Sequence, residues 1–170
     1  MPKKIKQPLN TTVFNGELGL KIKWNPKYAD NMNERMRYVQ SVIDNEVLKH
    51  MKPYIPRVTG TLMESATWGT VIGSGKIIQE QPYARYLYYG EIYGPNLPID
   101  DSGKINFTPG ANIVEWKSPK QKFATGRPLK YNTAHNPLAG KKWFERMKTD
   151  NIDKIRGSAQ KALGKAGSVK

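Results

Sequence analysis

The chain has 170 residues and no cysteine, which fits one domain and excludes disulfides, thiolate catalysis and every cysteine-ligated metal site. No stretch approaches the about 20 apolar residues of a membrane-spanning helix. The basic N-terminus lacks the apolar run of a secretory signal. We therefore expect a single domain over residues 1–170, made in the cytoplasm, with basic ends that fray at about 1–15 and 164–170.

The net charge of +14 is concentrated towards the two ends of the chain. Residues 1–27, 102–140 and 141–170 carry +5, +5 and +6, whereas residues 28–60 carry +1 and residues 61–101 carry −3. Basic ends suit the phosphates of a nucleic acid, an acidic face of a protein partner, or simple solubility. Charge alone does not choose among these three.

The first half of the chain predicts a strand and then a long helix. Residues 18–24 alternate between apolar and other side chains, a period of two that is typical of a strand with one buried face. Asn25–Pro26 then opens a helix to about Met51, because apolar residues recur at steps of three and four. Pro53 and Pro56 end this helix, since proline lacks the amide donor. The alternating apolar residues are Leu18, Leu20, Ile22 and Trp24.

The second half is less regular. Residues 61–78 predict a β-hairpin that turns at Gly73–Ser74–Gly75, and residues 82–90 predict a short helix or strand ended by Gly90. Residues 91–137 predict a long loop with a marginal hairpin, and residues about 140–163 a second long helix. We therefore expect one α+β domain.

Few side chains suit catalysis or metal binding. His50 and His135 lack metal-binding spacing. We expect His50 at a helix C-terminus and His135 in a turn or as an anchor of the last helix, with a general base as the alternative. Asp100–Asp101 precedes Ser102–Gly103 and indicates a turn rather than a glycosidase pair. We predict no catalytic residue, metal or cofactor.

Two further patterns suggest ligands but have simpler explanations. Gly73–Ser74–Gly75–Lys76 lacks the spacing of a phosphate-binding loop, so a hairpin turn is favoured. A run of tyrosines with Arg85 could stack on nucleic-acid bases, but the charge of −3 over residues 61–101 favours packing in the core or at a protein interface. These tyrosines are Tyr83, Tyr86, Tyr88, Tyr89 and Tyr93.

Three motifs follow one another in a specific order: YIPRVTGTL (54–62), PYARYLYYG (82–90) and HNPLAGKKWFERMK (135–148). Over nearly its whole length the chain resembles the minor capsid proteins of tailed phages, in the head–tail joining and tail-completion group. The resemblance implies two long helices packed on a mostly antiparallel sheet, with a long variable loop. It also implies a structural virion protein without enzymatic activity or a small-molecule substrate.

The resemblance further implies that the protein forms a ring, with six subunits as one option, at the neck of the virion. Its partners would be the connector or stopper and the tail terminator. At the motif positions, Gly60 would let the turn after Thr59 close, Leu62 would reach the core, Ala84 would leave room beneath tyrosines, and Trp143 would anchor the last helix with its neighbour. The full motif set is Thr59, Gly60, Leu62, Pro82, Tyr83, Ala84, Gly90, Trp143 and Phe144.

Residues 91–134 are longer and more basic than a simple connecting loop. They would project towards a neighbouring subunit or towards the channel that carries DNA. We expect basic ends to pair with acidic side chains of a neighbour, and the alternative function is a small basic nucleic-acid-binding protein. The candidate interface residues are Glu64, Glu80, Arg85, Tyr86, Tyr89, Glu91, Lys117, Lys120, Lys122 and Arg127.

Overall fold

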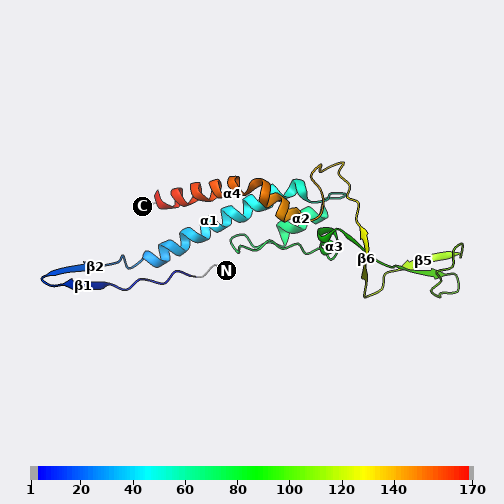
Figure 1. The fold of residues 1–170 in the computed structure, drawn as a ribbon, viewed down its shortest axis with the longest axis horizontal. Helices are drawn as coiled ribbons and strands as arrows, with labels where there is room; N and C mark the ends of the chain where they lie inside the picture. The colour runs from blue at the N-terminus through cyan, green and yellow to red at the C-terminus, as the bar shows by residue number, and fades with distance from the viewer. Residues whose placement is uncertain (1–3, 169–170) are drawn as a thin grey trace.

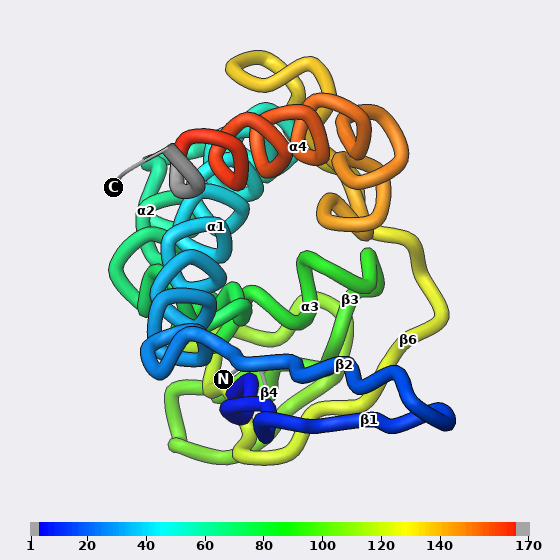
Figure 2. The backbone as a smooth tube through the Cα atoms, turned by 90° about the vertical axis from the view of Figure 1, so that its left-hand side faces the viewer, coloured from blue at the N-terminus to red at the C-terminus, as the bar shows by residue number. Residues whose placement is uncertain are grey.

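The computed structural model describes residues 4–168 of the chain. They form an elongated molecule, in which a helical body lies between two projecting β arms (Figure 1). Seen along the long axis, the C-terminal helix lies above the first long helix, and the N-terminal hairpin lies below both (Figure 2).

The helical body is built on two long helices that pack along each other. These are α1 (Tyr28–Met51) and α4 (Trp143–Ser168). Asn25 starts α1: its side-chain oxygen accepts the amide of Lys27 at 2.9 Å, and its carbonyl accepts the amide of Tyr28 at 3.0 Å. Three short helical elements complete the body: η1 (Lys52–Tyr54), α2 (Thr61–Trp68) and α3 (Ala84–Tyr89).

The core lies where the end of α1 meets the first turns of α4. Four large side chains there are almost completely buried: Met51, Ile55, Trp143 and Met147. Leu62 and Ala66 from α2 and Ala84 from α3 join the same cluster. Packing at this junction therefore places all four α-helices relative to one another.

In the described part of the chain, the strands form three separate antiparallel pairs. At the N-terminus, β1 (Thr11–Asn15) pairs with β2 (Leu18–Ile22). Beyond α3, β3 (Glu91–Gly94) pairs with β6 (Phe123–Pro128), and β4 (Leu97–Asp100) pairs with β5 (Ile113–Lys117). Within residues 4–168, no pair is extended into a larger sheet.

The predicted mixture of helices and antiparallel strands is confirmed, and both long helices lie close to the predicted positions. The expectation that these helices pack on a sheet is wrong. They pack on each other, because the strand pairs stand at the two ends of the molecule. The last helix also begins at Trp143 and continues past residue 163 to Ser168.

The hairpin predicted over residues 61–78 is wrong. Residues 61–68 form α2, because Leu62 and Ala66 lie one helical turn apart and both face the core. Gly73 and Gly75 nevertheless adopt the positive φ angles of a turn, 89° and 72°. Residues 91–137, expected as a loop with one marginal hairpin, contain four strands in two pairs.

The expected fraying of the ends also differs from the structure. Residues 11–15 form β1, and residues 164–168 continue α4. The rest of the predicted frayed ends includes residues 1–3 and 169–170, which lie outside the described residues.

Candidate assembly surfaces

The first two motifs hold the short helices against the core. Gly60 has a φ of 96° at the start of α2, and Leu62 is buried to 4% exposure, so both take their expected roles. Thr59 contacts the hydroxyl of Thr61 at 2.8 Å. Ala84 is buried in the core cluster, whereas Pro82 and Tyr83 lie exposed in the turn before α3.

Gly90 ends α3 in the left-handed conformation, with a φ of 76°. A side chain at this position would place its Cβ 2.9 Å from the hydroxyl of Tyr131 and 3.0 Å from Cβ of Lys141. Both the backbone conformation and the close contacts therefore require glycine here.

The third motif fixes the start of α4. Trp143 is 1% exposed and packs edge to face on Tyr88, with the ring centroids 4.7 Å apart. The side chain of Asn136 donates to the carbonyl groups of Lys52 and Ile55 at 3.1 and 2.7 Å. The anchor before α4 is thus Asn136, and the neighbouring His135 is exposed.

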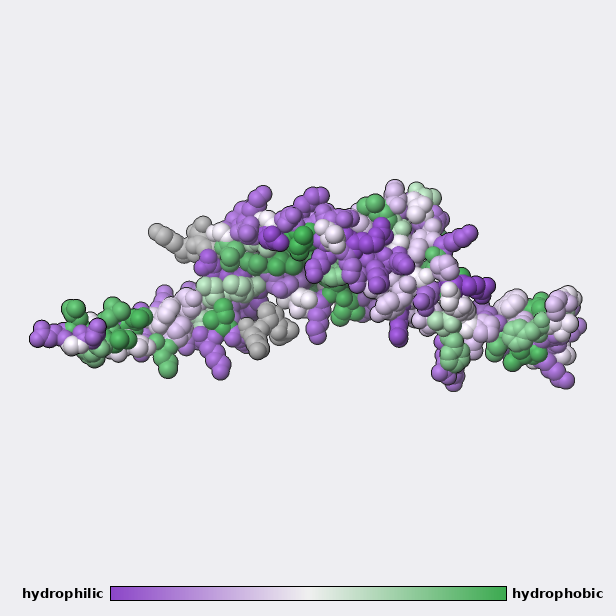
Figure 3. Space-filling view, viewed as in Figure 1, coloured by the Kyte–Doolittle hydropathy of each residue, from purple (hydrophilic) through white to green (hydrophobic). Residues whose placement is uncertain are grey.

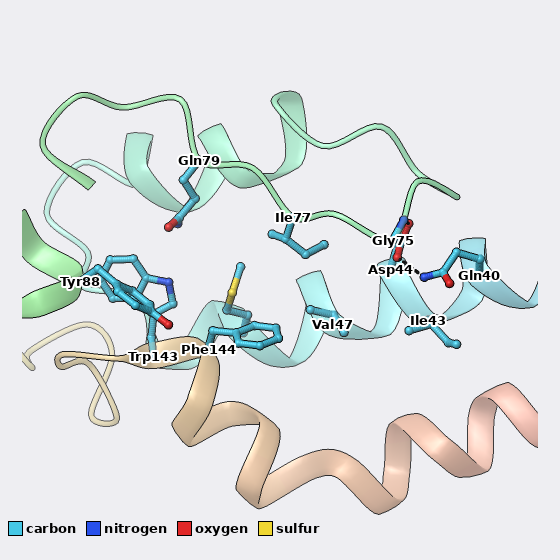
Figure 4. Close-up of a pocket in the computed structure, with 11 residues that line it drawn as sticks. Gln40, Ile43, Asp44, Val47, Gly75, Ile77, Gln79, Tyr88, Trp143 and Phe144 are labelled. Atoms are coloured by element: carbon cyan, nitrogen blue, oxygen red, sulfur yellow. Dashed lines mark hydrogen bonds between the residues drawn. The ribbon is translucent and has the colours of Figure 1, made fainter. Parts of the chain in front are cut away.

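Phe144 does not anchor α4 as expected, because its side chain is 37% exposed. It lines a groove of about 420 Å³ between α1, the start of α4 and residues 75–79 (Figure 4). Apolar side chains dominate this groove, which we call the α1–α4 groove. They are Ile43, Val47, Met51, Ile77, Tyr88, Trp143 and Phe144.

Asp44 closes one end of the α1–α4 groove by binding the glycine turn. The carboxylate is 2% exposed, and one oxygen accepts the amides of Gly73 and Gly75 at 2.8 and 3.1 Å (Figure 4). The other oxygen accepts the side-chain amide of Gln40 at 2.8 Å. The amides that a phosphate would need are thus occupied by the chain's own carboxylate.

The hairpin arm, residues 11–22, exposes an apolar face. Val13 lies opposite Leu20 in the strand register, and Leu18 and Ile22 belong to the same face because each lies two residues from Leu20. Their exposed fractions are 52%, 63%, 81% and 41%, in that order. The sequence predicted a buried face for this strand, and the described chain leaves that face uncovered (Figure 3).

The root of the hairpin arm is tied to the first turns of α1. Ile5 and Asn33 exchange two hydrogen bonds, at 2.8 and 3.0 Å. Gln7 accepts the amide of Ala29 at 3.0 Å, and Asn10 accepts the amide of Trp24 at 2.8 Å. These bonds hold the arm so that it points away from the helical body (Figure 1).

The distal arm, residues 95–122, lies at the opposite end of the molecule (Figure 1). Its strands β4 and β5 make their contacts chiefly with each other. Apolar side chains gather on its surface (Figure 3), and the most exposed are Ile105, Phe107, Val114 and Trp116. Asp100 closes its loop by accepting hydrogen bonds from Ser102 and Lys104.

The bonds to Asp100 hold its pKa below the ordinary value, with the hydroxyl of Ser102 as the largest cause and the amide of Lys104 next. This geometry confirms the predicted turn. The other carboxylate of the doublet, Asp101, is exposed in the same turn.

The candidate interface residues do not form one surface. All are exposed except Lys122, which is partly buried. Arg85, Tyr86 and Tyr89 lie on α3, with Glu91 just beyond it. Glu64 lies on α2, and Glu80 lies beside the end of that helix. Lys117 and Lys120 lie on the distal arm and Arg127 on β6.

A second surface brings tyrosines and cations together, which the regional charges did not predict. Two adjoining hollows of about 240 and 250 Å³ share Tyr83, Leu87 and Leu129. Arg57, Lys122 and Lys130 from distant parts of the chain also line them. We call this surface the tyrosine groove, and its other aromatic residues are Tyr86, Tyr93 and Tyr131.

The histidines lie apart from both grooves. His50 occupies the last turn of α1 as predicted, with Nε2 3.2 Å from Glu46. Across residues 4–168, no three histidine or acidic side chains gather as a group that could hold a metal ion. None of the helices in this range is both long and apolar enough to cross a membrane.

In comparisons with known proteins, no family model, curated protein or solved structure matches this chain. The function is therefore argued from the three sequence motifs and from the surfaces described above.

Sequence reasoning missed β1 and the clamp formed by Asp44. The hairpin has a local signal, because Gly16 precedes the apolar alternation of residues 18–24 and takes the first loop position with a φ of 63°. Asp44 has no such signal. It lies on the apolar side of a helix, and its partners are backbone amides about 30 residues away, which sequence spacing does not reveal.

Proposed function

We propose that this protein is a structural component of a tailed-phage virion, which assembles as a ring in the neck and joins the head to the tail. Its partners are further copies of itself, the connector or stopper on the head side, and the tail terminator. The proposal combines the order of the three sequence motifs with the two-ended shape of the molecule.

The observation that carries the proposal is the large surface of the single chain. Its accessible area is 12841 Å², whereas a compact protein of this size exposes about 8,500 Å². A standard protein interface removes roughly 800 Å² from each partner. The excess is therefore ample for the two subunit contacts per copy that a ring requires.

The placement of the exposed apolar side chains supports contacts between unlike surfaces. The hairpin arm and the distal arm lie at opposite ends of the molecule (Figure 1). Contacts that join two different surfaces of one subunit close into rings or extend into filaments. Isolated two-stranded hairpins are only marginally stable in water, so both arms would gain order in such contacts.

The proposed function is tested by an early stop codon in this gene of the phage that carries it. Negative-stain microscopy should show full heads and free tails, and a plasmid copy of the gene should restore joined particles. Normal joined particles without the protein would contradict the proposal.

The net charge is also consistent with the alternative function, nucleic-acid binding. The tyrosine groove adds a specific observation in favour of this alternative. Arg57, Lys122 and Lys130 lie beside exposed tyrosine rings, and single strands bind through stacking next to positive charge. Binding of a labelled oligonucleotide that weakens steeply with salt and is lost in Tyr83→Ala would favour this function. Absence of binding at low salt would exclude it.

The expected pairing of basic ends with Glu64, Glu80 and Glu91 stays a proposal. Glu64 and Glu80 lie near α2 and Glu91 lies beyond α3, and no described contact joins the three. Replacing all three with glutamine should weaken ring formation at low salt. Unchanged assembly would exclude the pairing.

A further inference from the structure

The hairpin arm and the α1–α4 groove are both apolar and both open, yet the arm does not occupy the groove of its own chain. The arm precedes the first turn of α1, whereas the groove lies beside the second half of that helix. Ile5 donates to Asn33 and Gln7 accepts from Ala29, so the residues that precede the arm are tied to the first turns of α1. The groove of one copy could therefore be covered by the hairpin arm of a second copy.

We propose that the hairpin arm of one copy docks in the α1–α4 groove of a second copy. The apolar face of Val13, Leu18 and Leu20 would cover Ile43, Val47 and Phe144. This inference rests on the self-assembly named in the proposed function, but it does not depend on the place of the protein in a virion.

The alternation of the arm is the first argument for this contact. A strand with a period of two is stable when one face is buried. The apolar face contains no charged side chain, and Lys21 lies on the opposite face with Phe14. An outside surface is therefore needed to bury this face, and it must be apolar.

The wall of the groove is the second argument. Residues 76–81, KIIQEQ, have the composition of a strand, and the structure shows them running past α1 without a partner strand (Figure 4). Ile77 points into the groove, and the described chain gives no backbone hydrogen bond to Ile77, Gln79 or Glu80. An exposed strand-like segment of this kind readily accepts a neighbouring strand.

The surface area is the third argument for a second copy of the chain as the occupant. Each molecule carries one arm and one groove, so every copy in a closed ring would bury both. The excess of exposed area over a compact protein exceeds the roughly 1,600 Å² that two such contacts would remove from each subunit. In a closed ring, a contact between unlike surfaces also leaves no hairpin arm uncovered.

The absence of cysteine allows a direct test by disulfide cross-linking in the full chain. Two chains of different tag length carry Leu20→Cys and Phe144→Cys, and they are mixed and mildly oxidised. We expect a cross-linked dimer of unequal chains, which reduction reverses. Two matched controls should lose this dimer: Phe14→Cys, on the opposite face of the arm, and Lys49→Cys, on the exposed side of α1.

Other patterns of cross-linking would overturn the inference. Dimers formed only between two Leu20→Cys chains would indicate that arms stack on each other. An intrachain disulfide in the double variant at high dilution would indicate that the arm folds back on its own groove. Rings that form without any cross-link between arm and groove would exclude this contact and leave the proposed function intact.

Assembly of variants without cysteine gives an independent measurement. Leu20→Ser should raise the protein concentration for half-assembly by roughly tenfold or more, because one apolar anchor is lost from the contact. Phe14→Ser should leave it nearly unchanged. Equal effects of the two variants would overturn the inference, and a wild-type protein that stays monomeric would contradict both this contact and ring formation.

Discussion

Asp44 shows how one buried carboxylate can fix a long connection. Its two oxygens bind Gln40 on one side and the amides of Gly73 and Gly75 on the other. The variant Asp44→Asn keeps only one side-chain oxygen. Either the side-chain amide of Gln40 or the backbone amides of the glycine turn therefore lose their acceptor. We expect a loss of about 1–3 kcal/mol in the free energy of unfolding, measured by urea titration. Glu34→Gln, on the exposed side of the same helix, is the control, and equal losses would contradict the clamp.

Tyr88 gives a prediction for alkaline pH. Burial, and then the hydrogen bond to Glu145, raise the pKa of its hydroxyl. The folded protein therefore keeps the proton where the unfolded chain loses it, so the stabilisation is complete below about pH 10 and falls as the pH rises further. The stability difference between the wild type and Tyr88→Phe should shrink from pH 8 to pH 11. A constant difference in urea unfolding at both pH values would contradict this assignment.

Local signals at single residues were reliable where the backbone itself imposes the requirement. Gly60 and Gly90 have positive φ angles, Pro53 follows the end of α1, and Leu62 and Trp143 reach the core. Phe144 could not be separated from Trp143 by sequence, because both are large apolar residues at a helix start. Only the packing of α1 and α4 decides which of the two is buried.

At the scale of elements, the distal arm should be dispensable for folding of the helical body. Gly94 and Phe123 are paired at its base, so Asn-Gly can replace residues 95–122 with a tight turn. We expect an unchanged cooperative transition at 222 nm, with a small shift of its midpoint, because the hydrophobic cluster that joins the helices has no member in the arm. Loss of the cooperative transition would show that the arm stabilises the body.

Long elements with a strong period were predictable from sequence, whereas the pairing of short strands was not. The apolar period of α1 extends over 24 residues and ends at prolines. The strands β3 to β6 have at most six residues each, and β4 pairs with β5 across a loop of 12 residues. Such pairings depend on register and loop closure rather than on local composition. For the same reason, the predicted hairpin over residues 61–78 did not form, although part of this segment has a strand-like composition.

At the scale of the whole molecule, an apolar face that the sequence predicts to be buried is exposed in the single chain. This difference supports the proposed assembly. The alternation of residues 18–24 predicts burial, yet Leu18 and Leu20 are 81% and 63% exposed. Under the proposed function, this face would be buried by a second copy of the chain. The most exposed apolar segments are thus the places where that proposal puts the contacts between copies.

The elongated shape itself gives a final prediction. A compact protein of this length has a radius of gyration of about 15.5 Å, but the hairpin arm and the distal arm extend the molecule at both ends (Figure 1). Small-angle X-ray scattering of the dilute protein should give a clearly larger radius, which increases with concentration as copies associate. A radius near the compact value would mean that the arms fold onto the helical body. Their apolar faces would then be covered within one chain, and the argument for contacts between copies would fail.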